Sequence, residues 1–353
     1  MNEDQLIIKY KQHRSRHKAY ISIMLLLLVA GGLIALVLGG GAVGWEHLVD
    51  LLQGKSTATS ELILLHVRLP RIVAAILAGM ALAVSGSVMQ ILLRNPLASP
   101  YTLGISNASA FGAALAIVFL GAGSAVQKSG DMFIVDNPYI VTICAFIGSL
   151  VGLTLILLIA KVRKSTPETI ILSGVIISSL FGAGIAAMQY IANNVQLGSI
   201  VFWTFGDLGK SDWFKLLYVS IITIPVLFYF YANRWNYKVL RAGDEYAVSL
   251  GVNAQRLRIM GMIATSLCTA IVVSFFGVIA FVGLVVPHIV RRIIGTNEEF
   301  LIPASAIFGA LFLMICDLTA RLLFSPVILP VGIITSFLGV PVFLFFLLKR
   351  DER

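Results

Sequence analysis

Charged residues are scarce in this chain. Lysine, arginine, aspartate and glutamate make up 12% of its 353 residues, whereas hydrophobic types make up 58%. Soluble domains carry about a quarter charged residues, so this composition, with a mean hydropathy of +0.94, excludes a water-soluble globule. Because one membrane-spanning helix needs about 20 apolar residues, we predict an all-α polytopic membrane protein with about ten spans. No soluble catalytic domain fits between them.

Cysteine and histidine are also few. Cys144, Cys268 and Cys316 all fall within apolar stretches, so they indicate small buried residues and say nothing about disulfides. The histidines lack the paired spacing of metal ligands. They are His13, His17, His47, His66 and His288. We expect no metal site, no cofactor and no catalytic residue.

Ionisable residues are nearly absent from the middle of the apolar stretches. Each charged side chain at that depth costs about 2.5–3.5 kcal/mol, and carriers driven by ion gradients usually retain some. Asp317 is the one clear case, with Arg321 one helical turn away as a partner. Residues 54–56 (Gly-Lys-Ser) resemble the end of a phosphate-binding loop, but Val49 stands where its first glycine belongs. Energy for pumping would therefore come from another subunit.

Nine apolar stretches are free of charge. They cover 20–40, 72–93, 103–122, 139–160, 169–192, 213–232, 259–290, 301–320 and 331–348. The stretch 259–290 would be about 48 Å long as one helix, against a hydrocarbon core of about 30 Å. Gly277, Gly283 and Pro287 offer break points, so we interpret it as one span followed by a shorter returning helix. The prediction is ten spans in a single domain, 1–353, with both termini on one side.

Basic residues are sorted across these spans, and acidic residues are not. With residues 1–19 as a cytoplasmic tail, 19 lysines and arginines fall inside and 7 outside, while the acidic residues divide 9 to 8. This bias follows the positive-inside rule and accounts for the net charge of +9 without a nucleic-acid partner. A basic segment before an apolar run also suits a signal peptide, but a run of about 20 residues favours a retained first span.

Small residues form a stripe in the stretch 169–192. Gly174, Ser178 and Gly182 recur at every fourth position, which lets helices pack closely. The alternative is that this helix lines a wide, weakly polar translocation path. The hydroxyl groups suited to such a path belong to Ser173, Ser178 and Ser179.

Four segments together resemble the permease family of ABC importers that take up iron chelates, haem and vitamin B12. They are 68–104, with Arg-Leu-Pro-Arg at its start and Asn-Pro-Leu-Ala-Ser-Pro at 95–100; 243–252; 277–291; and 329–343. They occur in order at the expected ends of ten spans. The resemblance implies a type II importer permease fold, in which helices two to five and seven to ten form an inverted repeat.

The resemblance also implies partners and a cargo. Family members act as two permease chains, identical or related, with two ATP-binding subunits inside and a substrate-binding protein outside. An iron(III)–siderophore is the expected cargo, with haem and vitamin B12 as alternatives, and the expected location is a prokaryotic cytoplasmic membrane. A stand-alone secondary carrier, or an intramembrane enzyme, is the alternative from a different class.

The longest cytoplasmic loop, 233–258, is the expected coupling element. Residues 242–250 predict a short helix with two acidic residues in its first turn, ending at Gly251, where a left-handed residue is tolerated. A second short helix is expected from Ala254. By resemblance, this pair would sit in a groove of the ATPase. The residues assigned to coupling are Gly243, Asp244, Glu245, Ala247, Leu250 and Gly251.

Three arginines, Arg68, Arg71 and Arg321, run against the charge bias on the outer side. Family members receive glutamates of the binding protein at comparable positions, so the resemblance implies that these arginines dock that protein. Helix capping, contact with lipid phosphates and, for Arg321, pairing with Asp317 are the alternatives. The segments 95–96 (Asn-Pro) and 287–288 (Pro-His) are expected to end or redirect helices.

Overall fold

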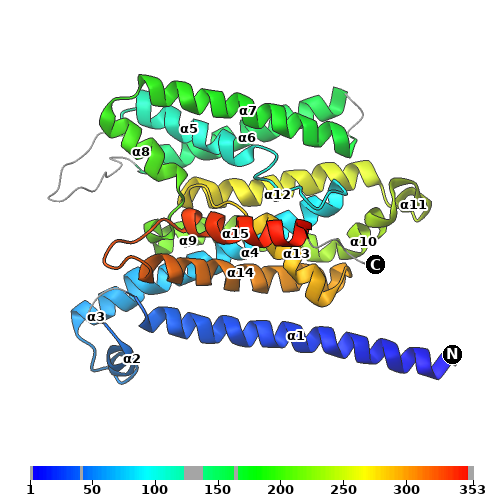
Figure 1. Cartoon of the computed structure of the whole chain (residues 1–353), viewed down its shortest axis with the longest axis horizontal. Coiled ribbons are helices and arrows are strands. Elements are labelled where there is room, and N and C mark those ends of the chain that lie inside the picture. Colours follow the sequence, from blue (N-terminus) through cyan, green and yellow to red (C-terminus); the bar gives the residue numbers. More distant parts are fainter. Residues whose placement is uncertain (1–2, 40–42, 123–137, 163–165, 349–353) are drawn as a thin grey trace.

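The computed structural model describes residues 3–39, 43–122, 138–162 and 166–348, and these ranges contain helices and no strand. Ten helices match the ten predicted spans (Figure 1). They are α1 (Glu3–Val37), α4 (Leu69–Leu92), α5 (Ile105–Phe119), α6 (Pro138–Val162), α7 (Pro167–Ile191), α9 (Trp213–Ala232), α12 (Ala254–Phe276), α13 (Val282–Ile294), α14 (Glu298–Leu322) and α15 (Val331–Leu348). Some basic residues in the charge count, such as Lys128 and Arg163, lie outside the described ranges.

Shorter helices connect or extend these ten. They are α2 (Trp45–Leu52), α3 (Ala58–Leu62), the π-helix η1 (Ile63–Arg68), α8 (Asn194–Thr204), the 3₁₀ helix η2 (Leu208–Lys210), α10 (Arg234–Ala242) and α11 (Asp244–Ser249). The first residues of α1 and the last of α15 lie toward the same end of the bundle as α10 and α11, and α2 lies at the opposite end (Figure 1). We call these two ends the α11 end and the α2 end.

The long apolar stretch 259–290 is divided as predicted. Helix α12 ends at Phe276, and the shorter α13 begins at Val282. The expectation of a second short helix from Ala254 is wrong, because Ala254 begins the full-length α12. The Asn253 side chain caps that helix by accepting a hydrogen bond from the Arg256 N–H at 2.9 Å. The short helix that pairs with α11 is instead α10, which precedes it.

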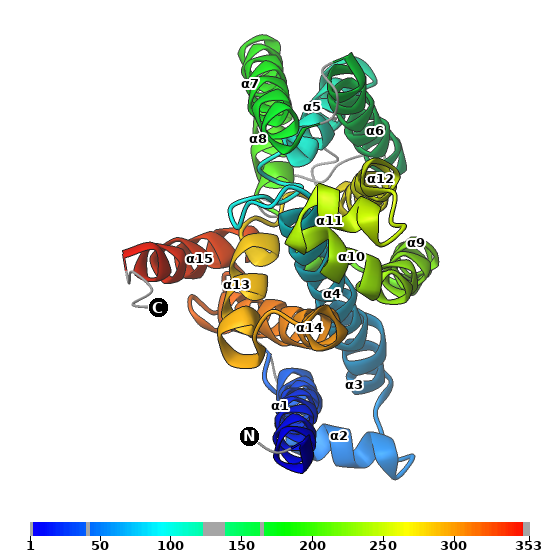
Figure 2. The same ribbon diagram turned by 90° about the vertical axis from the view of Figure 1, so that its right-hand side faces the viewer.

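Helix α4 lies at the centre of the bundle. In the continuous helical segment Ala58–Leu92, 83% of an 18-residue apolar stretch is buried. The corresponding value for α1, at the edge of the bundle, is 11%. Figure 2 shows α4 surrounded by α9, α12, α13 and α14. Close approach depends on small residues, because a Cβ on Gly86 would lie 1.8 Å from the Gly283 carbonyl oxygen of α13.

Two sets of four helices occur in the same order along the chain and run in opposite directions. Helices α4 to α7 have 24, 15, 25 and 25 residues, and α12 to α15 have 23, 13, 25 and 18. The second helix of each set is short and follows a left-handed residue, Gly104 or Phe281. The contacts repeat too: α4 packs on α14 as α12 packs on α6, and α4 packs on α13 as α12 packs on α5.

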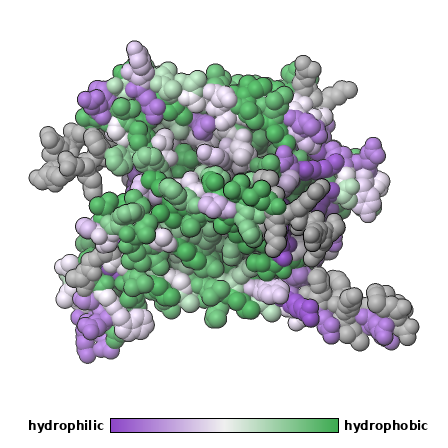
Figure 3. Space-filling view, viewed as in Figure 1, coloured by the Kyte–Doolittle hydropathy of each residue, from purple (hydrophilic) through white to green (hydrophobic). Residues whose placement is uncertain are grey.

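The exterior suits a membrane. An apolar belt crosses the middle of the molecule, and polar residues gather toward the two ends (Figure 3). Large apolar side chains that are exposed include Leu26 of α1, Leu180 of α7 and Phe228 of α9. Seven helical segments within the described ranges are long and apolar enough to cross a bilayer, and α5 and α15 are shorter apolar helices.

Candidate functional site

The first candidate site is the elbow formed by α10 and α11. Gly243, with φ of +141°, separates the two helices, and Gly251, with φ of +79°, follows α11. The predicted short helix, its acidic first turn and its stop at Gly251 are thus all present. Ala247 is buried, whereas Glu245 and Leu250 are exposed. The six residues assigned to coupling therefore form one projecting turn of chain.

Helix α10 fixes one side of the elbow. Its residues Tyr237 and Leu240 are fully buried, and the helix contacts α4 and α14. Burial raises the pKa of the Tyr237 phenol, so this side chain stays neutral and acts as part of the core. Near the end of α10, Arg241 pairs with Glu298 at 2.9 Å, where α14 begins.

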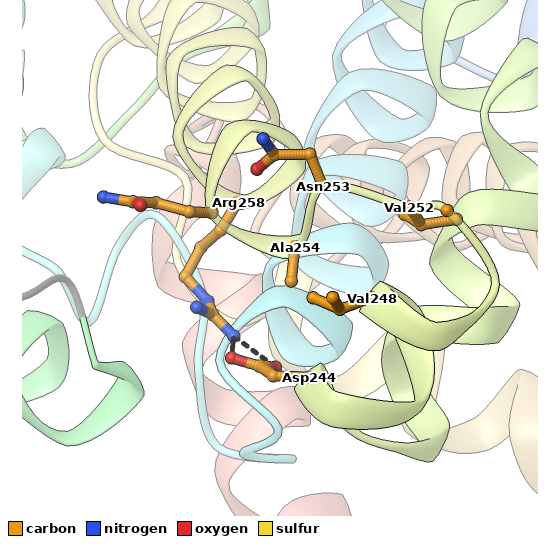
Figure 4. Close-up of a pocket in the computed structure, with 8 residues that line it drawn as sticks. Asp244, Val248, Val252, Asn253, Ala254 and Arg258 are labelled. Carbon is orange, nitrogen blue, oxygen red and sulfur yellow. Dashed lines mark hydrogen bonds and ion pairs between the residues drawn. The ribbon is translucent and has the colours of Figure 1, made fainter.

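A groove of about 540 Å³ opens between α11 and the start of α12 (Figure 4). The residues lining it are Asp244, Val248, Gly251, Val252, Asn253, Ala254, Gln255 and Arg258. Asp244 and Arg258 face each other across it and are joined by hydrogen bonds. Arg94, which follows α4, also pairs with Asp244. The sequence does not reveal these two arginines as partners of Asp244, because they lie 150 and 14 positions away from it.

The second candidate site is the arginine cluster toward the α2 end. The Asp317 carboxylate accepts from Arg71 Nε at 2.8 Å and pairs with Arg321 Nε at 3.2 Å. The predicted Asp317–Arg321 pair is therefore confirmed. Arg71 is a further partner that spacing along the chain could not reveal. All three side chains are buried. Arg71 Nη2 also lies 3.8 Å from Asp207 Oδ1, so two carboxylates face the two arginine charges inside the chain.

Arg68 caps the end of α1. Its Nη1 donates to the carbonyl oxygens of Leu36, Val37 and Val43, and its Nη2 donates to that of Gly39, over 2.8–3.0 Å. These carbonyls lie at and beyond a helix C-terminus, where intrahelical donors are missing. Arg68, Arg71 and Arg321 thus all have structural roles within the chain. Their docking role stays a prediction.

The three serines proposed for the translocation path have different environments. Ser173 is buried and donates to the Thr169 carbonyl at 2.7 Å. Ser178 accepts from Asn107 of α5 at 2.7 Å. Ser179 lies on the exposed face of α7. Close packing explains Gly174, because a Cβ there would lie 2.6 Å from a methyl carbon of Leu103.

The two proline segments behave differently. Pro96 follows the end of α4, as expected, in a turn where the Asn95 side chain accepts from the Leu97 N–H at 2.8 Å. Pro287 was expected at a helix end, and this is wrong, because it lies inside α13. A proline leaves the carbonyl four residues earlier without its helical donor. That carbonyl belongs to Gly283, and Gln90 of α4 donates to it at 3.5 Å.

No group of three or more potential metal ligands occurs among the described residues. The sites within the described ranges are ion pairs, helix caps and a groove. What the chain offers is a membrane-embedded bundle with an exposed elbow at one end.

Comparison with known proteins identifies the family. The model of the FecCD transport family matches residues 26–349. An ABC transporter permease protein of Methanocaldococcus jannaschii is 49% identical over 345 residues, 98% of each chain. A hemin transport permease of Yersinia pestis is 36% identical over 289 residues, 82% of this chain and 84% of that one. A vitamin B12 import permease of Vibrio parahaemolyticus is 34% identical over 355 residues, 100% and 99% of the two chains.

A solved structure has the same fold. It is described as an inward-facing conformation of a metal-chelate type ABC transporter, with a TM-score of 0.81 and 29% identity, and it covers 94% of this chain and 99% of that one. The predicted type II importer permease fold is therefore confirmed, and the chain is a multi-pass transport subunit rather than an enzyme. The chain belongs to the FecCD transport family of ABC importer permeases, whose members serve iron chelates, haem and vitamin B12.

Proposed function

We propose that this chain is one of two permease chains that carry an iron(III)–siderophore inward across the cytoplasmic membrane by alternating access. A separate pair of ATP-binding subunits supplies the energy. The observation that carries the proposal is the α10–α11 elbow. Its exposed Tyr246, Val248 and Leu250 present an apolar face at the end of a membrane bundle, where a soluble subunit can cover it. Gly243, Asp244, Glu245, Ala247, Leu250 and Gly251 form this coupling element.

In this proposal the α11 end faces the cytoplasm. Arg94, Arg241, Arg256 and Arg258 all belong to segments at that end, in agreement with the positive-inside rule. Both termini are then cytoplasmic, because α1 begins and α15 ends on that side (Figure 1).

The cargo assignment is supported by the similar solved structure, which is described as metal-chelate type. Haem and vitamin B12 are the second candidates, because permeases named for those cargoes are 36% and 34% identical to this chain. Ser179, on the exposed face of α7, is our candidate for the path. Ser173 and Ser178 stay candidates as well, although Ser173 bonds to the Thr169 carbonyl of its own helix and Ser178 bonds to Asn107 of α5.

A substrate-binding protein would deliver the cargo at the α2 end. Arg68 holds the chain segments at the end of α1, and Arg71 joins α4 to α14 through Asp317. In the proposed complex Arg68, Arg71 and Arg321 dock the binding protein by fixing the structure of this surface, and acidic residues of the binding protein contact it. Charge pairs across such an interface would mainly set orientation and encounter rate.

Isolation of the assembly tests this function. The tagged chain is solubilised gently from its own cells, its partners are identified, and the complex is placed in liposomes with the recovered binding protein. Uptake of a ferric hydroxamate, a ferric catecholate, haem and cobalamin is then compared. We expect ATP-dependent uptake of a ferric chelate and none by the chain alone. Uptake by the chain alone under a proton or sodium gradient would instead establish a secondary carrier.

A further inference from the structure

Asp244, at the start of α11, is held by arginines from two different parts of the bundle. Arg258 Nη2 of α12 donates to both carboxylate oxygens, at 2.9 and 3.0 Å (Figure 4). The Nε of the same guanidinium donates to the carbonyl oxygen of Leu92 at 3.0 Å, at the end of α4. Arg94 pairs with Asp244 from the turn that follows α4. One side chain, Arg258, therefore joins three helices.

The two arginines do not contribute equally. The Arg258 side chain is 4% exposed and that of Arg94 is 38% exposed, while the Asp244 side chain that they share is 42% exposed. Exposed ion pairs contribute about 0–1 kcal/mol, because water and salt screen them. Charge-assisted hydrogen bonds from one guanidinium to both carboxylate oxygens are stronger and more specific in geometry than a single exposed ion pair. Arg258 is therefore the main partner of Asp244, and Arg94 is the lesser one.

Helix α11 has few other attachments. Ala247 is its one buried residue, and glycines with positive φ flank the helix on both sides. No atom lies within 4 Å of the position that a Cβ of Gly251 would take. Because α11 is short and its flanks turn easily, its orientation relative to α4 and α12 depends on Asp244.

We propose that Asp244 and Arg258 form a latch that passes a displacement of α11 to α4 and α12. The inference rests on the proposed function, in which an ATPase moves α11. Of the seven long apolar segments described, those of α4 and α12 are the most enclosed, with 83% and 67% of their windows buried. Both helices contact each other and α9, and α4 also contacts α13 and α14. A shift of this pair therefore reaches most of the bundle as a rigid-body motion.

Asp244 and Arg258 act here as positioning residues, since they are placed to orient α11 rather than to contact cargo or nucleotide. Asp244→Asn keeps the size of the side chain and removes its charge. We expect the variant complex to assemble and to hydrolyse ATP, while uptake per ATP hydrolysed falls on the order of tenfold. Asp244→Glu, which restores the charge, should recover most of that ratio.

The control is Glu168→Gln. Like Asp244→Asn, this change removes an acidic side chain from the first turn of a helix. Glu168 is exposed in the first turn of α7 and lies far along the chain from the elbow. Arg258→Lys is the second latch variant, because lysine keeps the charge but has one nitrogen in place of the separate Nε and Nη2 that hold Leu92 and Asp244. It should lower the ratio as Asp244→Asn does. Glu168→Gln should leave the ratio at the parent value.

The measurement uses the reconstituted complex and the four probes named above. An unchanged ratio in both Asp244→Asn and Arg258→Lys overturns the latch. A parallel loss of assembly, hydrolysis and uptake in both variants also overturns it, because that pattern indicates a structural role only. If the unaltered complex takes up none of the probes in an ATP-dependent manner, the proposed function itself has failed. Failure of the latch and failure of the proposed function therefore give different results.

Discussion

Asp317 shows how a membrane helix tolerates a carboxylate. The residue is 2% exposed, and two buried arginines, Arg71 and Arg321, surround its oxygens. The cost of desolvating three charges is offset only while all of them are present. Helical spacing revealed Arg321, which lies on the same face. Arg71 is 246 positions away and is brought near only by the packing of α4 on α14.

Removing the Asp317 charge should therefore destabilise the chain strongly. Asp317→Asn leaves buried Arg321 without its counter-charge and leaves Arg71 only the more distant, partly exposed Asp207, 3.8 Å away. We expect it to lower the free energy of unfolding by about 3–5 kcal/mol. Asp212→Asn is the control, because Asp212 is more exposed and asparagine can still cap α9. Thermal unfolding in detergent measures both. Equal melting temperatures for the two variants would contradict a compensating role for Asp317.

At the scale of elements, apolar periodicity and length predicted the spans well. The stretch 213–232 matches α9 at both ends, and the break in 259–290 falls beside Gly277, one of the three proposed break points. The two errors have different causes, one a contact between distant segments and the other a local helix cap. Pro287 remains inside α13 because Gln90 of α4 replaces a missing donor, and α12 begins early because Asn253 caps it. The Gln90 contact spans 193 positions and cannot be read from local composition, whereas the Asn253 cap is a local signal that the prediction of a short helix left unused.

The turn after α11 allows a sharp test of the elbow. Valine at position 251 would have to adopt a φ near +79°, at a cost of about 1–2 kcal/mol, so the chain should relax and reorient α11. We expect Gly251→Val to remain in the membrane and hydrolyse ATP while uptake falls. Gly54→Val is the matched control, since Gly54 has a φ of +69°, equally open surroundings and a place at the α2 end. Normal uptake by Gly251→Val would refute the coupling role.

At the scale of the whole molecule, the inverted repeat is a property that the sequence hardly displays. Residues 108–115 and 304–311 look alike, yet they belong to α5 and α14, which are not equivalent helices of the two sets. The repeat becomes evident in helix lengths and in which helices pack together. Two sets that run in opposite directions place similar helix ends at both membrane surfaces, so we infer the orientation of the bundle from the distribution of its basic residues.

Orientation can be tested directly with single cysteines. Val248→Cys lies on exposed α11, and Val327→Cys lies between α14 and α15 at the opposite end. Cys268 and Cys316 are buried, and only the partly buried Cys144 needs replacement by serine. A maleimide that cannot cross membranes should label position 327 in intact cells, and position 248 only after the cells are opened. Labelling of position 248 in intact cells would place the elbow outside, where ATPase subunits that work in the cytosol could not reach it.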